Sequence, residues 1–154
     1  MQVTHKSAVL GGVYICILGL FLLGCEPNNP ESAGLKHVDT SLCNFKSGLC
    51  AQTVADVVIQ LSITPWQAPS ERPLQLNLNT SAEVGNVKVK LQGRDMFMGV
   101  IPVNLAKIGK NDYKAPLIYG SCSSGYMVWS AVVSFEVDGV ERFTTFDFLA
   151  DHPG

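Results

Sequence analysis

The Met and Cys residues of this chain have side chains and a spacing that could bind a metal ion. Met96 and Met98 are separated by one residue, so both thioethers project from the same side of an extended backbone. Met127 could supply a third thioether, and Cys122 lies five residues before it. Soft sulfur ligands select Cu(I) over harder cations, so the set predicts a copper site. The alternative places the methionines in the core, where Met fills irregular gaps.

An uncharged run from Ala8 to Gly24 follows Lys6 near the start of the chain. A positive start followed by an apolar stretch is typical of an export signal. The run ends in Leu22-Leu23-Gly24-Cys25, which resembles the lipobox of bacterial lipoproteins. In that class the chain is cut before the Cys, and the Cys thiol carries a diacylglycerol.

The lipobox resemblance implies that residues 1–24 are a signal peptide and that lipid on Cys25 anchors the mature chain to a membrane. Glu26 after the Cys implies sorting to the periplasmic face of the outer membrane. The alternatives are an uncleaved signal anchor and a secretory peptide cut elsewhere. Residues 25–42 then read as a lipidated N-terminus and tether, 43–150 as one domain and 151–154 as a tail.

The composition of the mature chain limits its partners and cofactors. Lys6 is the one charged residue of the signal peptide, so 10 basic and 13 acidic residues remain and the net charge becomes −3. With no basic stripe, we expect no nucleic-acid partner. The remaining 130 residues are enough to form a core without a metal.

Three cysteines remain after removal of the signal peptide and lipidation of Cys25: Cys43, Cys50 and Cys122. The odd number predicts one disulfide and one further thiol in an oxidising compartment. Proximity favours a Cys43–Cys50 bridge, which would leave Cys122 available to a metal. A bridge from either residue to Cys122 would instead remove that ligand.

No pattern in the sequence predicts an enzyme. Ser121 and Ser123 do not fit a Gly-x-Ser-x-Gly elbow, and Arg94-Asp95 reads as ordinary surface charge. Cys122 would need a positioned base to act as a nucleophile, while the mature histidines lie near the chain ends. We therefore expect a non-catalytic protein.

Alternation of apolar and polar residues predicts short β-strands and no helix. The longest such pattern runs from Met127 to Val137, and Asp138-Gly139 after it predicts a type I′ hairpin turn into Val140–Leu149. Pro116 indicates an edge strand over Tyr113–Tyr119. We expect an all-β fold, an antiparallel β-sandwich of immunoglobulin-like type with about seven strands, with a small closed barrel as the alternative. Further strands are predicted around residues 57–63, 74–78 and 87–91.

Two further segments carry a resemblance to a family. Gly93–Gly99 follows the pattern G-x-x-M-x-M-G, and Cys122–Trp129 follows C-x(4)-M-x-W. Together with the loop between Cys43 and Cys50, they resemble small exported proteins of proteobacteria linked to Sco-type copper chaperones and cytochrome oxidase assembly. The resemblance implies a copper-related context and no particular reaction.

Two functions follow from these observations. The first is a lipid-anchored accessory protein that binds or handles copper through Met96, Met98, Met127 and Cys122. The second is a non-catalytic module of the cell envelope that binds a protein partner and keeps its methionines in the core.

Overall fold

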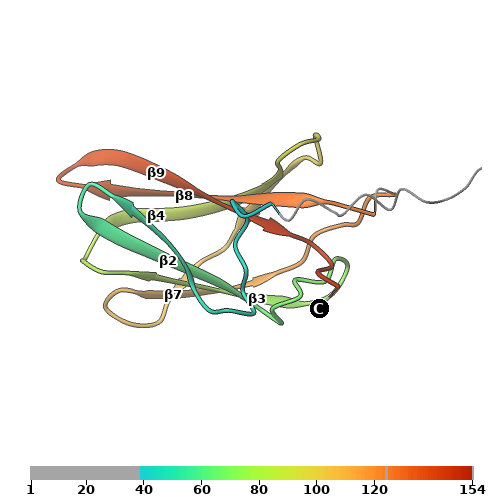
Figure 1. Ribbon diagram of the computed structural model, residues 1–154. Coiled ribbons are helices and arrows are strands. Elements are labelled where there is room, and N and C mark those ends of the chain that lie inside the picture. The colour runs from blue at the N-terminus through green and yellow to red at the C-terminus, as the bar shows by residue number, and fades with distance from the viewer. Residues whose placement is uncertain (1–38, 124, 154) are drawn as a thin grey trace, which may run out of the picture. The chain divides into compact units, whose positions relative to one another are not determined.

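Nine β-strands in two antiparallel sheets make up the part of the chain that the computed structural model describes, residues 39–123 and 125–153 (Figure 1). The predicted signal peptide, Cys25 and the tether as far as residue 38 lie outside the described residues. The five-stranded sheet has the order β1 (Cys50–Val54), β2 (Val57–Thr64), β3 (Leu74–Thr80), β7 (Asp112–Leu117) and β6 (Ala106–Lys107). The four-stranded sheet has the order β5 (Val100–Val103), β4 (Gly85–Gly93), β8 (Val128–Val137) and β9 (Val140–Leu149).

The predicted all-β sandwich is therefore confirmed, with nine strands in place of about seven. The immunoglobulin-like type stays a prediction. Alternate residues of the main strands point between the sheets, as the period of two requires. The large aromatic side chains of the core come mainly from β8 and β9, whereas β2 and β3 contribute aliphatic ones. The fully buried side chains of the core include Trp129, Phe135, Phe146, Phe148, Ile59, Leu61, Leu76 and Leu78.

The β8–β9 hairpin turns at Asp138-Gly139, as the sequence predicts. Both residues have positive φ, 52° and 75°, and Val137 pairs with Val140 across the turn. Positive φ at both central residues is the requirement of a type I′ turn. Ten consecutive pairs follow from this turn, so the register of β9 on the aromatic core is fixed by the turn.

The edge-strand prediction for residues 113–119 is wrong, because β7 lies between β3 and β6. The short strand β6 pairs only with Lys114 and Tyr113 of β7. Pro116 lies beyond this pairing, and it needs no partner on that side because it has no N–H to donate. The sheet therefore tolerates Pro116, because the neighbouring strand β6 has two residues and does not extend as far as the proline.

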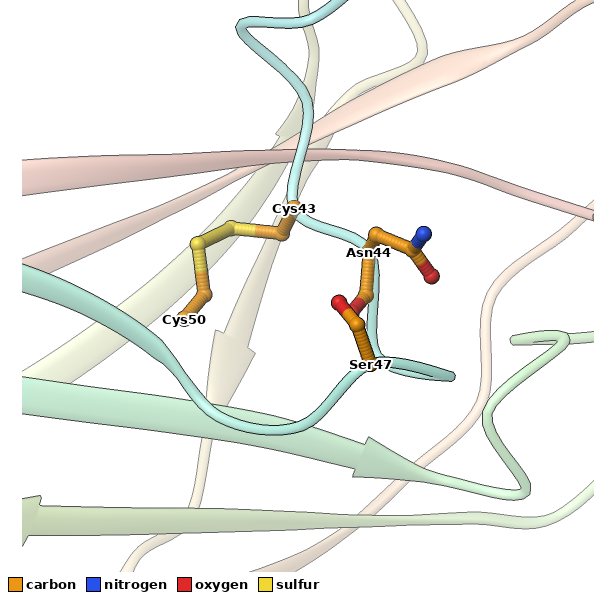
Figure 2. The surroundings of a disulfide bond; sticks show 4 residues. All are labelled: Cys43, Asn44, Ser47 and Cys50. Carbon is orange, nitrogen blue, oxygen red and sulfur yellow. A yellow bond between two sulfur atoms is a disulfide. The ribbon is translucent and has the colours of Figure 1, made fainter.

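Cys43 and Cys50 form the predicted disulfide, with 5.5 Å between their Cα atoms (Figure 2). Cys43 pairs with Phe148 of β9 in a parallel bridge, and its N–H donates to the carbonyl oxygen of Asp147 at 2.7 Å. Cys50 begins β1 of the opposite sheet. The eight residues between and including the cysteines therefore connect the β9 edge of one sheet to the β1 edge of the other.

The C-terminal segment is held against the loop between β2 and β3. The N–H groups of Asp151 and His152 donate to the carbonyl oxygens of Ala68 and Gln67. The Asp151 carboxylate accepts hydrogen bonds from the backbone N–H and hydroxyl of Ser70. Residues 151–153, which show no pattern in the sequence, thus pack on the sandwich. Among the described residues there is no helix with the length and apolarity to cross a membrane.

Candidate functional site at one end of the sandwich

The candidate residues of the sequence lie at one end of the sandwich, where β4 ends and β8 begins. Gly93, the last residue of β4, pairs with Trp129, and the N–H of Arg94 donates to the carbonyl oxygen of Val128 at 3.0 Å. The β4–β5 loop, which contains Met96 and Met98, therefore lies beside the start of β8. The β7–β8 connection, which contains Cys122, reaches β8 at this same end (Figure 1).

Arg94 fixes the base of the β4–β5 loop. Its Nη1 lies 3.0 Å from Oδ2 of Asp39, and its Nε lies 3.1 Å from Oδ1 of Asp95. A longer contact of 3.9 Å joins Nη1 to Oδ2 of Asp147 in β9. One guanidinium thus ties together the first described residue, the loop and the last-but-two residue of β9.

Hydrogen bonds stabilise the ionised forms of Asp39 and Arg94. Hydrogen bonds from Ser41 lower the pKa of the Asp39 carboxyl, and the hydrogen bond from Arg94 acts in the same direction. The hydrogen bond to Asp95, opposed by burial, raises the pKa of Arg94 above its usual range. The lowered pKa of Asp39 and the raised pKa of Arg94 both favour the charged forms of this pair at neutral pH.

Phe97 is the most exposed large apolar residue of the loop. Its exposed fraction is 92%, and that of Met96 is 39%, whereas Met98 is half-buried and packs against the core. The loop folds back on the end of β4, close to Gly93. A side chain at Gly93 would collide with the Met96 carbonyl oxygen and lie 3.0 Å from Cγ of Met98. The loop therefore presents Phe97 outward while Met98 holds it to the domain.

Met127 and Cys122 have more buried surroundings than Met96. Met127 is 5% exposed and belongs to the core, and its carbonyl oxygen accepts a hydrogen bond from Ala150. Cys122 is half-buried, packs against the core and stands outside the Cys43–Cys50 bridge. The four predicted copper ligands thus share an end of the fold but range from buried to exposed.

No group of three or more His, Cys, Asp or Glu side chains that could hold a metal ion is found within residues 39–123 and 125–153. The predicted ligands are mostly thioethers, a different kind of donor. Copper binding by Met96, Met98, Met127 and Cys122 therefore stays a prediction, and so does lipidation at Cys25, which lies outside the described residues.

Sequence reasoning missed two features of this end. Phe97 is one residue of an irregular stretch and gives no periodic signal for an outward orientation. Arg94 and Asp95 read as surface charge, whereas Arg94 is 26% exposed and bonds Asp39, 55 residues away in sequence. Such a long-range pair leaves no mark in a single sequence.

Comparison with known proteins gives distant likenesses to solved structures and no family. No family model and no curated protein matches the chain. A DUF4785 family protein from Legionella pneumophila aligns at 14% identity with a TM-score of 0.46, over 61% of this chain. This chain covers 28% of that protein's chain. BhCBM56, solved as a Br derivative, aligns at 14% identity with a TM-score of 0.41, over 64% of this chain and 97% of that one.

Proposed function

We propose that this chain is a non-catalytic, lipid-anchored module of the bacterial cell envelope, which contacts a protein partner through its β4–β5 loop. The observation that carries the proposal is the 92% exposure of Phe97 on a loop whose base is fixed by Arg94. Aromatic residues are enriched at protein interfaces, where a few of them supply most of the binding energy.

Other exposed apolar residues of the same end support this proposal. Met96 precedes Phe97, Val100 begins β5, and Tyr126 lies two residues before β8. Asp39 is ion-paired with Arg94 at this end. A lipid on Cys25 would hold the chain close to partners in or at the membrane.

In-cell photo-crosslinking tests this proposal. A photoreactive residue replaces Phe97 in one variant and Ile108, an exposed apolar residue that follows β6, in the control. We expect one discrete adduct from position 97 that is absent from position 108. The proposal fails if position 97 gives no adduct, or if both positions give the same one.

A second candidate function is copper handling at the same end. It is favoured by the meeting of the β4–β5 loop with the start of β8, which gathers Met96, Met98 and Met127 at one end. A Cu(I) competition titration compares the wild type with Met96→Leu/Met98→Leu, and Phe97→Leu serves as the control. Stoichiometric binding that only the double variant loses would establish the thioether site. Equal Cu(I) affinity of all three proteins would contradict copper binding by Met96 and Met98.

The immunoglobulin-like type of the sandwich is also a proposal. The orders β2-β3-β7 and β4-β8-β9 agree with A-B-E and C-F-G of an immunoglobulin domain. Three of the described strands remain. β6 pairs with β7 in the place of strand D, β5 pairs with β4 as strand C′ of a variable-type domain pairs with C, and β1 pairs with β2 outside this correspondence. The strand order supports a relative of that fold.

A further inference from the structure

The outer face of the four-stranded sheet carries an open groove of about 910 Å³. Its floor is formed by Val132 and Ser134 of β8, which are smaller than the side chains on either side. Lys88 and Lys90 of β4 line one side, and Phe143 of β9 lines the other. The register places these residues in adjacent rows, because Lys90 pairs with Val132, and Ser134 pairs with both Lys88 and Phe143. The groove shares no residue with the β4–β5 loop.

The groove combines an aromatic surface with positive charge. Phe143 is 71% exposed, so its ring is available to a ligand. Neither Lys88 nor Lys90 belongs to an ion pair of the described part of the chain. Glu141 also lines the groove, so the two lysines leave it with a net positive charge. The volume lies within the range of about 300–1,000 Å³ that is usual for ligand sites.

We propose that this groove binds an anionic glycan chain. The ring of Phe143 would cover the apolar face of a sugar ring, and the ammonium groups of Lys88 and Lys90 would bind sugar carboxylates. Gln92, Asn104 and Thr145 also line the groove and supply amide and hydroxyl groups that can hydrogen-bond to sugar hydroxyls. The proposal goes beyond the protein-binding function of the Phe97 end and does not depend on it.

The position of the groove favours a glycan over an extended peptide. A peptide strand binds by adding backbone hydrogen bonds to an open sheet edge. The groove instead lies on the face of the sheet, where β4 and β8 are each paired on both sides. Recognition there depends on side chains, which suits a ligand that presents hydroxyls and carboxylates along its length.

Calorimetric titration of the full chain in detergent with oligogalacturonate, which has a carboxylate on each sugar, tests the proposal. Its methyl ester is the uncharged probe, and a glutamate oligomer is the charged probe without sugar. We expect the acid oligosaccharide to bind at least about fivefold more tightly than either control probe, and salt to weaken its binding.

Variants of the groove complete the experiment. Lys88→Gln/Lys90→Gln should lower the affinity for the acid form about fivefold and leave the methyl ester unaffected, while Phe143→Ala should weaken both. Lys114→Gln, on the other sheet, is the matched control and should change nothing. No binding of the acid form, equal binding of the glutamate oligomer, or full affinity in the groove variants would overturn the proposal. None of these outcomes affects crosslinking at Phe97, so the two proposals fail separately.

Discussion

Arg94 has the largest number of charged contacts of any described side chain, and its role can be measured. Arg94→Gln leaves Asp39, Asp95 and Asp147 close together without their cation. Because these groups are partly exposed and screened by solvent, we expect the free energy of unfolding to fall by about 1 kcal/mol. Urea denaturation measures this change. Lys110→Gln, which removes an exposed contact of 4.0 Å to Glu83, should be neutral, and equal effects of both changes would contradict the role of Arg94.

Tyr119 predicts how stability depends on alkaline pH. Burial raises the pKa of its hydroxyl above the ordinary value of 10.0, and the hydroxyl donates to the carbonyl oxygen of Ala68. The unfolded chain therefore loses this proton at lower pH than the folded chain, so stability decreases as the pH rises above 10.0.

The variant Tyr119→Phe isolates this effect. Below pH 10.0 it should be less stable than the wild type by about 1 kcal/mol, because it lacks the hydrogen bond. Above pH 10.0 the difference should shrink, because only the wild type loses the proton of residue 119. Urea denaturation across this range measures both proteins, and all other titrating groups are common to the two. A constant difference would contradict the assignment.

At the scale of elements, the disulfide segment connects the edges of the two sheets. The cysteines are seven positions apart, and closing such a loop stabilises a protein by about 2.5 kcal/mol through the entropy of the unfolded chain. We expect Cys43→Ser/Cys50→Ser to lose about that amount in urea denaturation. A reductant should bring the wild type to the same stability and leave the double variant unchanged. If reductant leaves the free energy of unfolding of the wild type unchanged, this account is contradicted.

Strands with one buried face could be predicted from the sequence, and strands without one could not. The alternation over 57–63, 74–78 and 87–91 lies within β2, β3 and β4, and each strand turns its apolar residues to the core. The prediction missed β1 and β6, because their side chains are mostly exposed and polar or small, so no period of two marks them. Each forms by pairing with the next strand along the chain, β1 with β2 and β6 with β7.

The sequence predicts Met96, Met98 and Met127 as candidate ligands but not their exposure. The Met96–Met98 spacing assumes extended backbone, whereas residues 94–99 form a loop between β4 and β5. The alternation rule does not apply there, so Met98 packs on the core while Met96 and Phe97 are exposed. Met127, by contrast, precedes the regular strand β8 and is buried.

For the whole molecule, the decisive prediction concerns processing at Cys25. Expression of the full chain in a Gram-negative bacterium should give a product that lacks residues 1–24 and has the added mass of acyl chains on Cys25. The lipid supplies membrane affinity because each buried CH₂ contributes about 0.8 kcal/mol. Mass spectrometry of the intact protein measures this, and Cys25→Ala should retain residues 1–24. A wild type of full length, or one cut at another position, would contradict the anchor.

The edge strands of the two sheets also affect how copies of this chain behave when they are crowded. An open edge strand lets a second copy continue the sheet, and repetition of that step builds a filament. Cys43 pairs with Phe148 at one end of the β9 edge, and the opposite edges are the four-residue β5 with Pro102 and the two-residue β6. The β5 and β6 edges offer little length for a copy to add. If the proposed lipid anchor crowds copies on a membrane, these two edges are therefore poor sites for polymerisation.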